Sequence, residues 1–344
     1  MANKIKKETV IQVSSIVVAI GLFLTAVIAM TRMLNVNSNA SEVTTYATTQ
    51  HTAPEMSAAD DENKTKNYAF RDDIELILIM GVDDTENRGE TDTWINSSQA
   101  DFLYLLALDH TNKTYQVLQI NRDTMADVQT YTIEGQKYNV DQMQICLSHS
   151  YGKTDQGRSL NTVDAVSRLI FDVPIKHYVC LSMASIAVLN DQVGGVTLTM
   201  PKGLDYAYPE FKEGETIKLT GEQAEKFVRA RFLLEDDHNT YRMERQEMYL
   251  KAWKELAKAK MNEQSDFSLK LVLAVSQYMT SDMTANSLSE TANKIKEYKD
   301  LGTLTPNGVY KEADADHIYR EFHVDKDDLK KKVIELCYRE KTTE

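Results

Sequence analysis

An arginine and an aspartate stand side by side just after an apolar run in the first half of the chain. The run, "YQVLQI" at 115–120, has the composition of a buried strand, and Arg122 and Asp123 follow it in "NRDT". A salt bridge between the two side chains is one interpretation of this pair. A site for phosphate is the other, because the planar guanidinium group matches phosphate oxygens.

A second group of residues suited to anion binding lies in the second half of the chain. It comprises Arg229, Arg231, Arg242, Arg245 and Gln246. The last three lie on a helix predicted from Tyr241 to about Lys260, where their i, i+3, i+4 spacing puts them on one face. A solvated face would mix charges, so this stripe favours a phosphate site. For Arg245 the alternative is a structural ion pair with a nearby acid such as Glu247.

Two aspartates stand at the ends of predicted strands. Asp83 follows the apolar run "IELILIM" at 74–80, and Asp101 precedes "FLYLLAL" at 102–108. If these strands are neighbours, both carboxylates lie at one edge of the sheet. There they would jointly hold Mg²⁺ or Mn²⁺ together with substrate phosphates. The alternative is that both are solvated loop residues.

The elements that position these residues predict an α/β fold. The predicted strands are 74–80, 102–108, 115–120, 176–182 and 194–200. The spacer "DHTNK" makes the second and third a hairpin. Helical spacing of apolar residues occurs at 139–151 and 159–171, and Thr220 with Gln223 forms a capping box before another helix. We therefore expect a single domain with a central mixed β-sheet flanked by helices.

The first 31 residues predict a transmembrane helix. Lys4, Lys6 and Lys7 precede an uncharged run of 21 residues at 10–30, about the length that crosses a bilayer. The positive-inside rule places the N-terminus in the cytoplasm and the C-terminal domain outside the cell membrane. A cleaved signal peptide is the alternative, although this run is longer than a usual signal core.

Composition divides the rest of the chain into three parts. Residues 32–70 are polar and lack apolar periodicity, which predicts a flexible extracellular linker. Residues 71–262 form the predicted catalytic domain, and 263–344 a helical extension packed on it. The net charge of −13 argues against nucleic acid as a partner.

The chain lacks several familiar catalytic motifs. It has no Gly-rich P-loop, no GxSxG elbow, no HExxH sequence and no CxxC pair. Acidic strand ends and several arginines suit catalysis by positioning and charge neutralisation, as in phosphoryl transfer.

Seven short segments, in order, resemble the LytR-CpsA-Psr family of cell-wall glycopolymer ligases. They are "LILIMGVDD", "SQADFLYLLALD", "VLQINRDTM", "GQKYNVDQ", "KHYVCLSMASIAVLNDQVGGVTLTM", "LTGEQAEKFVRAR" and "YRMERQ". The resemblance covers roughly residues 72–255. Gln99 stands where the family usually has an arginine, and Asn121 replaces the proline before Arg122.

The resemblance implies an enzyme outside the membrane that moves a glycan-phosphate from a polyprenyl diphosphate carrier to peptidoglycan. It matches Asp83 and Asp101 to the metal-linked acids. It implies catalysis by Arg122, Asp123, Arg231 and Arg242, and pyrophosphate binding by Arg122, Arg229, Arg231, Arg242, Arg245 and Gln246. A polyprenyl diphosphate pyrophosphatase and a non-catalytic protein that binds lipid-linked glycan are the alternatives.

Overall fold

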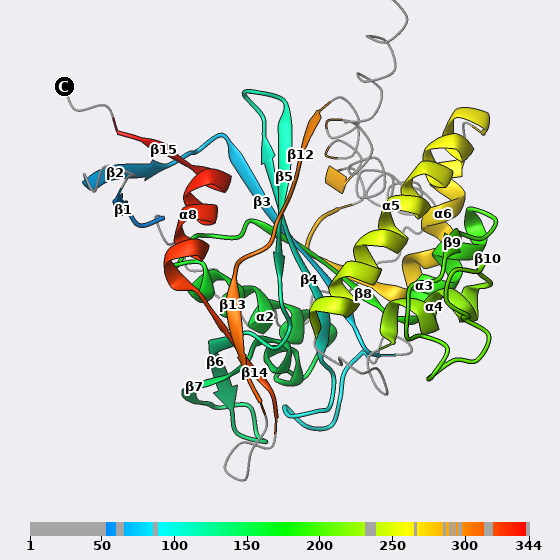
Figure 1. Ribbon diagram of the computed structural model, residues 1–344. Helices are drawn as coiled ribbons and strands as arrows, with labels where there is room; N and C mark the ends of the chain where they lie inside the picture. Colours follow the sequence, from blue (N-terminus) through cyan, green and yellow to red (C-terminus); the bar gives the residue numbers. More distant parts are fainter. Residues whose placement is uncertain are drawn as a thin grey trace, which may run out of the picture. The chain divides into compact units, whose positions relative to one another are not determined.

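A computed structural model of the chain describes residues 53–59, 65–84, 89–230, 239–264, 267–284, 287–288, 291, 294, 298–312 and 319–341. These residues divide into two compact units (Figure 1). The sheet unit takes its described residues from 36–181, 280–282 and 301–344, and the helical unit takes them from 182–279 and 283–300. Both units include parts of the single domain predicted over 71–262.

A six-stranded sheet forms the centre of the sheet unit. Its strand order is β11 (Met279–Ser281), β8 (His177–Ser182), β3 (Ile74–Val82), β4 (Ala100–Asp109), β5 (Thr114–Ile120) and β12 (Lys299–Leu304). The pairs β3–β4 and β4–β5 are antiparallel, which confirms the predicted hairpin. Strands β3 to β5 are buried along nearly their whole length, which explains their continuous apolar runs. The predicted central mixed sheet flanked by helices is confirmed.

Two α-helices, one 3₁₀ helix and several short strands complete the sheet unit. The helices are α2 (Asp155–Leu169), the 3₁₀ helix η2 (Ile145–Ser150) and α8 (Lys326–Cys337). The hairpins are β6 (Met125–Tyr131) with β7 (Lys137–Gln144), and β13 (Gly308–Lys311) with β14 (Glu321–Val324). A third small sheet joins β1 (Met56–Ala59), β2 (Thr65–Phe70) and β15 (Tyr338–Glu340). Side chains from the central sheet, α2 and α8 share one core, including Leu78, Leu105, Val166 and Val333.

The structure differs from the sequence prediction at three places. The prediction of a helix at 139–151 is wrong. Residues 137–144 form strand β7, which pairs with β6, and only the short η2 follows. Strands β1 and β2 lie inside the stretch predicted as a linker, where β1 pairs with β2 and β2 pairs with β15. The C-terminal part contains β11 to β15 as well as helices, so it is not purely helical.

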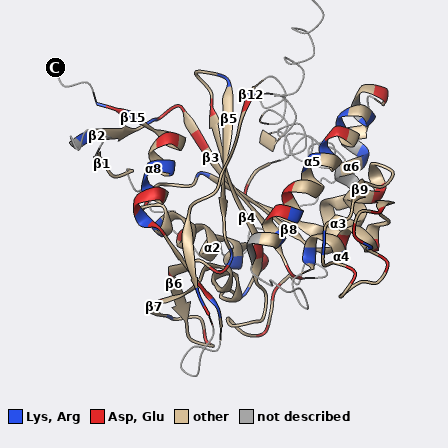
Figure 2. Ribbon diagram, in the orientation of Figure 1, with Lys and Arg blue, Asp and Glu red and all other residues tan. Residues whose placement is uncertain are grey.

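The helical unit contains the long helix that was predicted from Tyr241. Its elements are α3 (Ala184–Gln192), β9 (Thr197–Thr199), β10 (Thr216–Lys218), α4 (Gly221–Arg229), α5 (Asn239–Glu263), α6 (Phe267–Val275) and the 3₁₀ helix η3 (Ser276–Tyr278). The predicted capping box is confirmed at α4: the Thr220 hydroxyl accepts the Gln223 N–H, and the Gln223 side chain accepts the Thr220 N–H. Phe211, Phe227 and Trp253 are buried in the core of this unit. Basic and acidic residues are mixed along α5 (Figure 2).

Within the described ranges, no helix is both long and apolar enough to cross a bilayer. The predicted membrane span, 1–31, lies outside these ranges.

Candidate active site

A β-bulge in β4 sets the position of Asp101. Gly81 pairs with Phe102 and Val82 pairs with Ala100, so Asp101 is the extra residue on β4. A bulge interrupts the regular alternation of side chains and re-aims the inserted one, and bulges are common beside active sites. Asp101 therefore lies at the end of the buried sheet, half-buried, as its carboxylate needs if it is to meet a ligand.

The guanidinium group of Arg122 contacts three side chains. The β4–β5 register, continued past its last pair, sets Arg122 opposite Asp101. Nη1 donates to Asp101 Oδ1, Nη2 donates to Gln99 Oε1, and Nε lies 3.3 Å from Asp123 Oδ1. Burial opposes the charge of this group, but Cys146, Asp101 and Asp123 raise the pKa of Arg122 above its ordinary value. Arg122 is thus a fixed cation, and it is not tied to Asp123 alone.

Asp83 lies close to Asp101 across the strand ends. Asp83 Oδ1 accepts the Gln99 N–H at 2.8 Å, and the Asp83 N–H donates to the Gln99 carbonyl at 3.1 Å. Burial raises the pKa of Asp83, and the nearby charges of Asp101 and Asp84 raise it further. Two half-buried carboxylates that repel each other in this way suit a divalent cation, which would relieve the repulsion.

The donor set fits Mg²⁺ or Mn²⁺ only if other ligands join the two aspartates. No group of three or more His, Cys, Asp or Glu residues able to hold a metal ion occurs among the residues that the structure describes. Mg²⁺ commonly binds through one or two carboxylates plus waters and substrate phosphates, so two aspartates are a sufficient protein contribution. The metal site at Asp83 and Asp101 stays a prediction.

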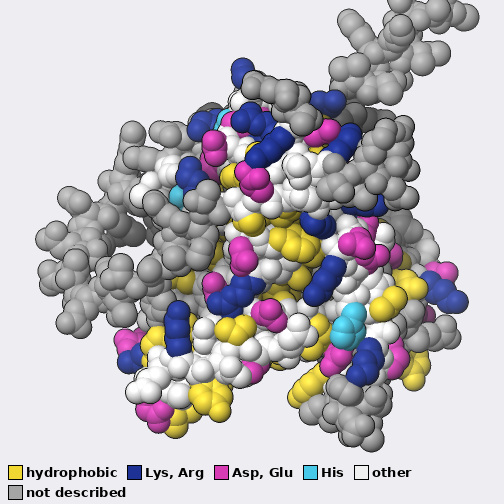
Figure 3. Space-filling model, turned by 90° about the vertical axis from the view of Figure 1, so that its left-hand side faces the viewer, with side chains coloured by type: hydrophobic (Ala, Val, Ile, Leu, Met, Phe, Trp, Pro, Cys, Tyr) yellow, Lys and Arg dark blue, Asp and Glu magenta, His cyan; other side chains and the backbone are white. Residues whose placement is uncertain are grey.

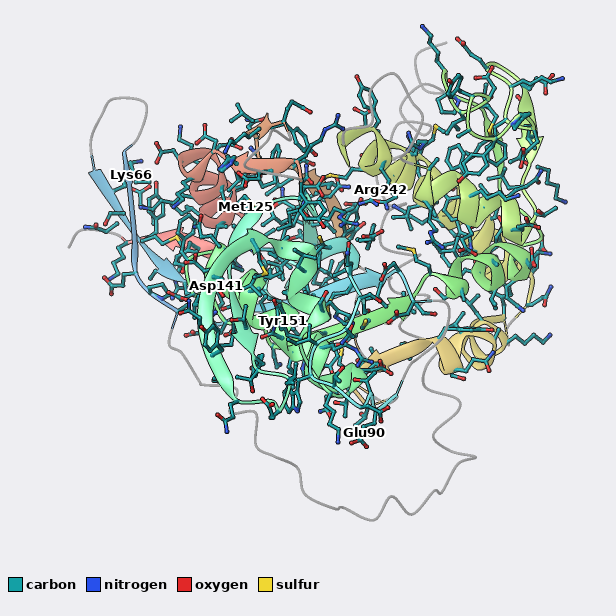
Figure 4. All side chains as sticks on the ribbon, turned by 90° about the horizontal axis from the view of Figure 1, so that it is seen from below. Lys66, Glu90, Met125, Asp141, Tyr151 and Arg242 are labelled. Carbon is teal, nitrogen blue, oxygen red and sulfur yellow. The ribbon has the colours of Figure 1, made fainter. Side chains whose placement is uncertain are left out.

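The turn that carries Arg122 and Asp123 is held by residues outside the predicted site. Asn121 Oδ1 accepts the Asp123 N–H at 3.0 Å, and Gln144 Nε2 donates to Asp123 Oδ1 at 3.2 Å. The Cys146 N–H donates to the Arg122 carbonyl at 3.1 Å. Strand β6 begins two residues after Asp123, at Met125, which is labelled in Figure 4.

These supporting residues carried no motif that would have revealed them. Gln99 and Asn121 were visible only as departures from the family pattern, and Gln144 lay in a segment predicted as helix. Burial raises the pKa of the Cys146 thiol to about 12 despite the adjacent Arg122. Cys146 is therefore a neutral thiol packed against the guanidinium group at neutral pH, and not a nucleophile.

The predicted site residues of the helical unit have different surroundings from one another. Arg229 ends α4, is exposed, and forms an ion pair with Glu225 at 2.7 Å. Arg245 donates to the Ala230 carbonyl, just past α4. Burial, with the repulsion of Arg242, lowers the pKa of Arg245 to about 10. Arg242 and Gln246 are also buried.

The predicted convergence of the arginines stays a prediction. Arg122 belongs to the sheet unit, whereas Arg229, Arg242, Arg245 and Gln246 belong to the helical unit. Arg231 lies outside the described residues. On the face shown in Figure 3, basic and acidic side chains are interspersed. Of the predicted site, the structure thus brings together Asp83, Asp101, Arg122 and Asp123.

Comparison with known proteins gives one matching family. The model of the LytR_cpsA_psr family matches residues 42–335. The polyisoprenyl-teichoic acid–peptidoglycan teichoic acid transferase TagU of Halalkalibacterium halodurans is 27% identical over 192 residues, which are 54% of this chain and 56% of that protein. TagU of Bacillus subtilis is 32% identical over 156 residues, 45% of this chain and 43% of that protein. The chain therefore spans about half the length of these two relatives.

The fold also resembles solved structures. The crystal structure of B. subtilis TagV matches 77% of this chain and 97% of its own, with a TM-score of 0.55 and 20% sequence identity. At this identity the likeness concerns the fold.

Proposed function

Because this chain belongs to the LytR_cpsA_psr family, we propose that it is a phosphotransferase that moves a glycan-phosphate from a polyprenyl diphosphate carrier to peptidoglycan. The observation that carries this proposal is the arrangement around Arg122. A buried, permanently charged guanidinium group lies beside Asp101, and Asp101 lies beside Asp83. A cation next to two close carboxylates suits a diphosphate bound with a divalent ion.

The proposed reaction is a displacement at phosphorus. A hydroxyl group of peptidoglycan attacks the phosphorus atom that carries the glycan, and its proton passes to the departing phosphate. The bond between this phosphorus and the bridging oxygen breaks, and polyprenyl phosphate leaves. Mg²⁺ at Asp83 and Asp101, when bound, would neutralise charge on the diphosphate oxygens.

The residues of the sheet unit supply positioning and charge in this scheme. Arg122 stabilises the negative charge on the transferring group, and its fork is held in place by Asp101 and Gln99. Asp123 lies beside the Nε atom of the same guanidinium group and helps to orient it. We also assign pyrophosphate contacts to Arg229, Arg242 and Gln246 of the helical unit, and to Arg231.

A polyprenyl carrier resides in the membrane, so the proposal includes an anchor. We propose that residues 1–31 cross the cell membrane once, with the N-terminus in the cytoplasm and the globular part outside. The support is the uncharged run behind three lysines. Protease added to intact, wall-stripped cells should then degrade the globular part, and its full protection would refute this orientation.

The activity is tested with the full-length protein in detergent. The substrate is a polyprenyl diphosphate-linked oligosaccharide, the acceptor is a soluble peptidoglycan oligomer, and Mg²⁺ is present. We expect a phosphodiester-linked glycan on the acceptor, detected by mass spectrometry, together with polyprenyl phosphate. Cleavage of the carrier with water as the only acceptor would instead identify a pyrophosphatase. Binding without cleavage would identify a non-catalytic protein.

A further inference from the structure

The β13–β14 hairpin, near the end of the chain, forms a backbone hydrogen bond with the turn that carries Arg122 and Asp123. The Phe322 N–H donates to the Asp123 carbonyl at 2.9 Å. Thr124 and Phe322 also form an isolated parallel β-bridge. A segment almost 200 residues further along the sequence thus continues the hydrogen bonding of the candidate catalytic turn.

Asn121 links the inside of this turn to the hairpin. Its Oδ1 accepts the Asp123 N–H at 3.0 Å, and its Nδ2 donates to the Tyr310 hydroxyl at 2.7 Å. One buried amide group therefore fixes the backbone conformation at Asp123 and attaches it to β13. An apolar side chain or a proline makes neither bond, which gives a reason for a polar residue such as asparagine immediately before Arg122.

Gln144 provides a second link, which reaches the carboxylate itself. Its Nε2 donates to Asp123 Oδ1 at 3.2 Å and to the Arg320 carbonyl at 2.7 Å, immediately before β14. Asp123 Oδ1 is also the atom that lies 3.3 Å from Arg122 Nε. The orientation of the guanidinium group is thus connected to the hairpin backbone through two side chains.

The hairpin is built to hold a fixed position. Tyr310 and Phe322 are directly opposite each other in the β13–β14 register, and their ring centroids are 5.1 Å apart. Phe322 is buried. The ring of Phe322 lies over Gly308, where an added Cβ would be 2.4 Å from Phe322 Cζ. Tight packing of this kind transmits a displacement of the hairpin to the turn, because close-packed groups do not deform freely.

We propose that the β13–β14 hairpin is a positioning element of the active site, acting on Arg122 and Asp123 through Asn121, Gln144 and the Phe322 N–H. This inference rests on the proposed function for its effect on catalysis, and on geometry alone for its effect on the turn. Tyr310 is accordingly a positioning residue, since its hydroxyl acts through Asn121.

The catalytic test compares Tyr310→Phe with Val309→Thr in the full-length protein. Val309 is the neighbouring residue on β13, is 69% exposed, and serves as the matched control. Loss of one neutral hydrogen bond should lower kcat by about 3- to 10-fold in Tyr310→Phe, with KM for the lipid-linked donor changed by less than about 2-fold. Asn121→Ala should lower kcat by a smaller factor in the Tyr310→Phe background than in the wild-type protein. Equal kcat in the two β13 variants, or effects that simply multiply, would overturn the proposal.

A second measurement does not depend on enzymatic activity. Hydrogen exchange of the 120–125 amides should be about 3-fold or more faster in Tyr310→Phe than in Val309→Thr, since the Asp123 and Thr124 amides bond within the turn. Unchanged exchange would refute the coupling even in an active enzyme. Faster exchange in a protein without transferase activity would support the coupling and reject the proposed function.

Discussion

Arg122 lies opposite Asp101 at the open end of the β4–β5 hairpin, and its Nη1 donates to the Asp101 carboxylate. The same aspartate is the inserted residue of the bulge opposite β3. The bulge and the hairpin register therefore place the Asp101 carboxylate against the guanidinium group of Arg122 and near enough to Asp83 for its charge to raise the pKa of Asp83. In the proposed function, Asp101 both orients the cation and contributes to the metal site.

The first prediction concerns the fork of Arg122. Arg122→Lys keeps the positive charge but cannot contact Asp101, Gln99 and Asp123 together, because an ammonium group has no planar fork. Each lost charged hydrogen bond is worth about 1.5–3 kcal/mol, so kcat should fall by roughly 10- to 100-fold or more. Steady-state kinetics and a thermal melt of the full-length protein provide the measurement.

Arg339→Lys is the control for this substitution, since Arg339 is exposed on β15. It should match the wild-type protein in kcat and in Tm. A kcat for Arg122→Lys within about 2-fold of the control would show that the ion pairs of Arg122 have only a structural role.

The second prediction concerns the divalent ion. Mg²⁺ added with a non-hydrolysable diphosphate should raise the Tm of the wild-type protein, because a ligand that binds only the folded state stabilises it. Asp83→Asn and Asp101→Asn should each lose this shift, since a neutral amide is a weaker ligand for a hard cation. Asp92→Asn, at an exposed position of the same loop, should retain it. A full Mg²⁺-dependent shift in either site variant would remove that aspartate from the metal site.

The sequence was sufficient for the parts of the fold that depend on local pattern. The apolar runs of β3, β4 and β5 reflect burial on both faces, and the capping box at Thr220 is a local hydrogen-bond motif. The prediction of a helix at 139–151 failed because β7 pairs with the adjacent strand β6, and this strand pairing overrides apolar spacing. The strands in the predicted linker have the same cause, since β2 is ordered by β15 from the far end of the chain.

The candidate site was predictable to the same extent. Charged residues at strand ends revealed Asp83, Asp101, Arg122 and Asp123, because their position follows from where each strand stops. Gln144 and Tyr310 carried no signal, since their roles depend on the docking of a hairpin that is remote in sequence. A register shift of one residue was equally invisible, although it decides the direction of the Asp101 side chain.

The third prediction separates Arg245 from the other arginines of the helical unit. Arg245 donates to the Ala230 carbonyl, which lies at the end of α4. Arg245→Lys should lose this bond and reduce the free energy of unfolding by about 1–3 kcal/mol. Arg229→Lys should change it by less than about 0.5 kcal/mol, because its pair with Glu225 is an exposed helical pair. Urea denaturation of the two variants provides the measurement. Unchanged stability of Arg245→Lys combined with a large loss of turnover would favour a direct role in pyrophosphate binding.

The last prediction concerns a buried lysine on α5, away from any assigned function. Lys254 is 3% exposed, and burial lowers its pKa to about 7, although Asp300, Glu255 and Glu247 act in the opposite direction. In the unfolded chain its pKa should be close to the ordinary value of about 10.4. Between these two pH values the unfolded chain binds more protons than the folded one, so the contribution of Lys254 to stability rises with pH. Below pH 7 both states are protonated and the full desolvation cost remains.

Lys254→Met should therefore abolish this dependence, because methionine does not titrate. The free energy of unfolding of the wild-type protein, minus that of Lys254→Met, should increase by about 2–4 kcal/mol between pH 6.5 and pH 10. Taking the difference cancels the titration of other groups, including the buried Cys and Tyr residues whose raised pKa values act with the opposite sign. Lys270 is an exposed lysine of α6 and serves as the control. The free energy of unfolding of Lys270→Met should change with pH in parallel with that of the wild-type protein. A difference between wild type and Lys254→Met that stays flat across this pH range would show that Lys254 keeps its proton in the folded state.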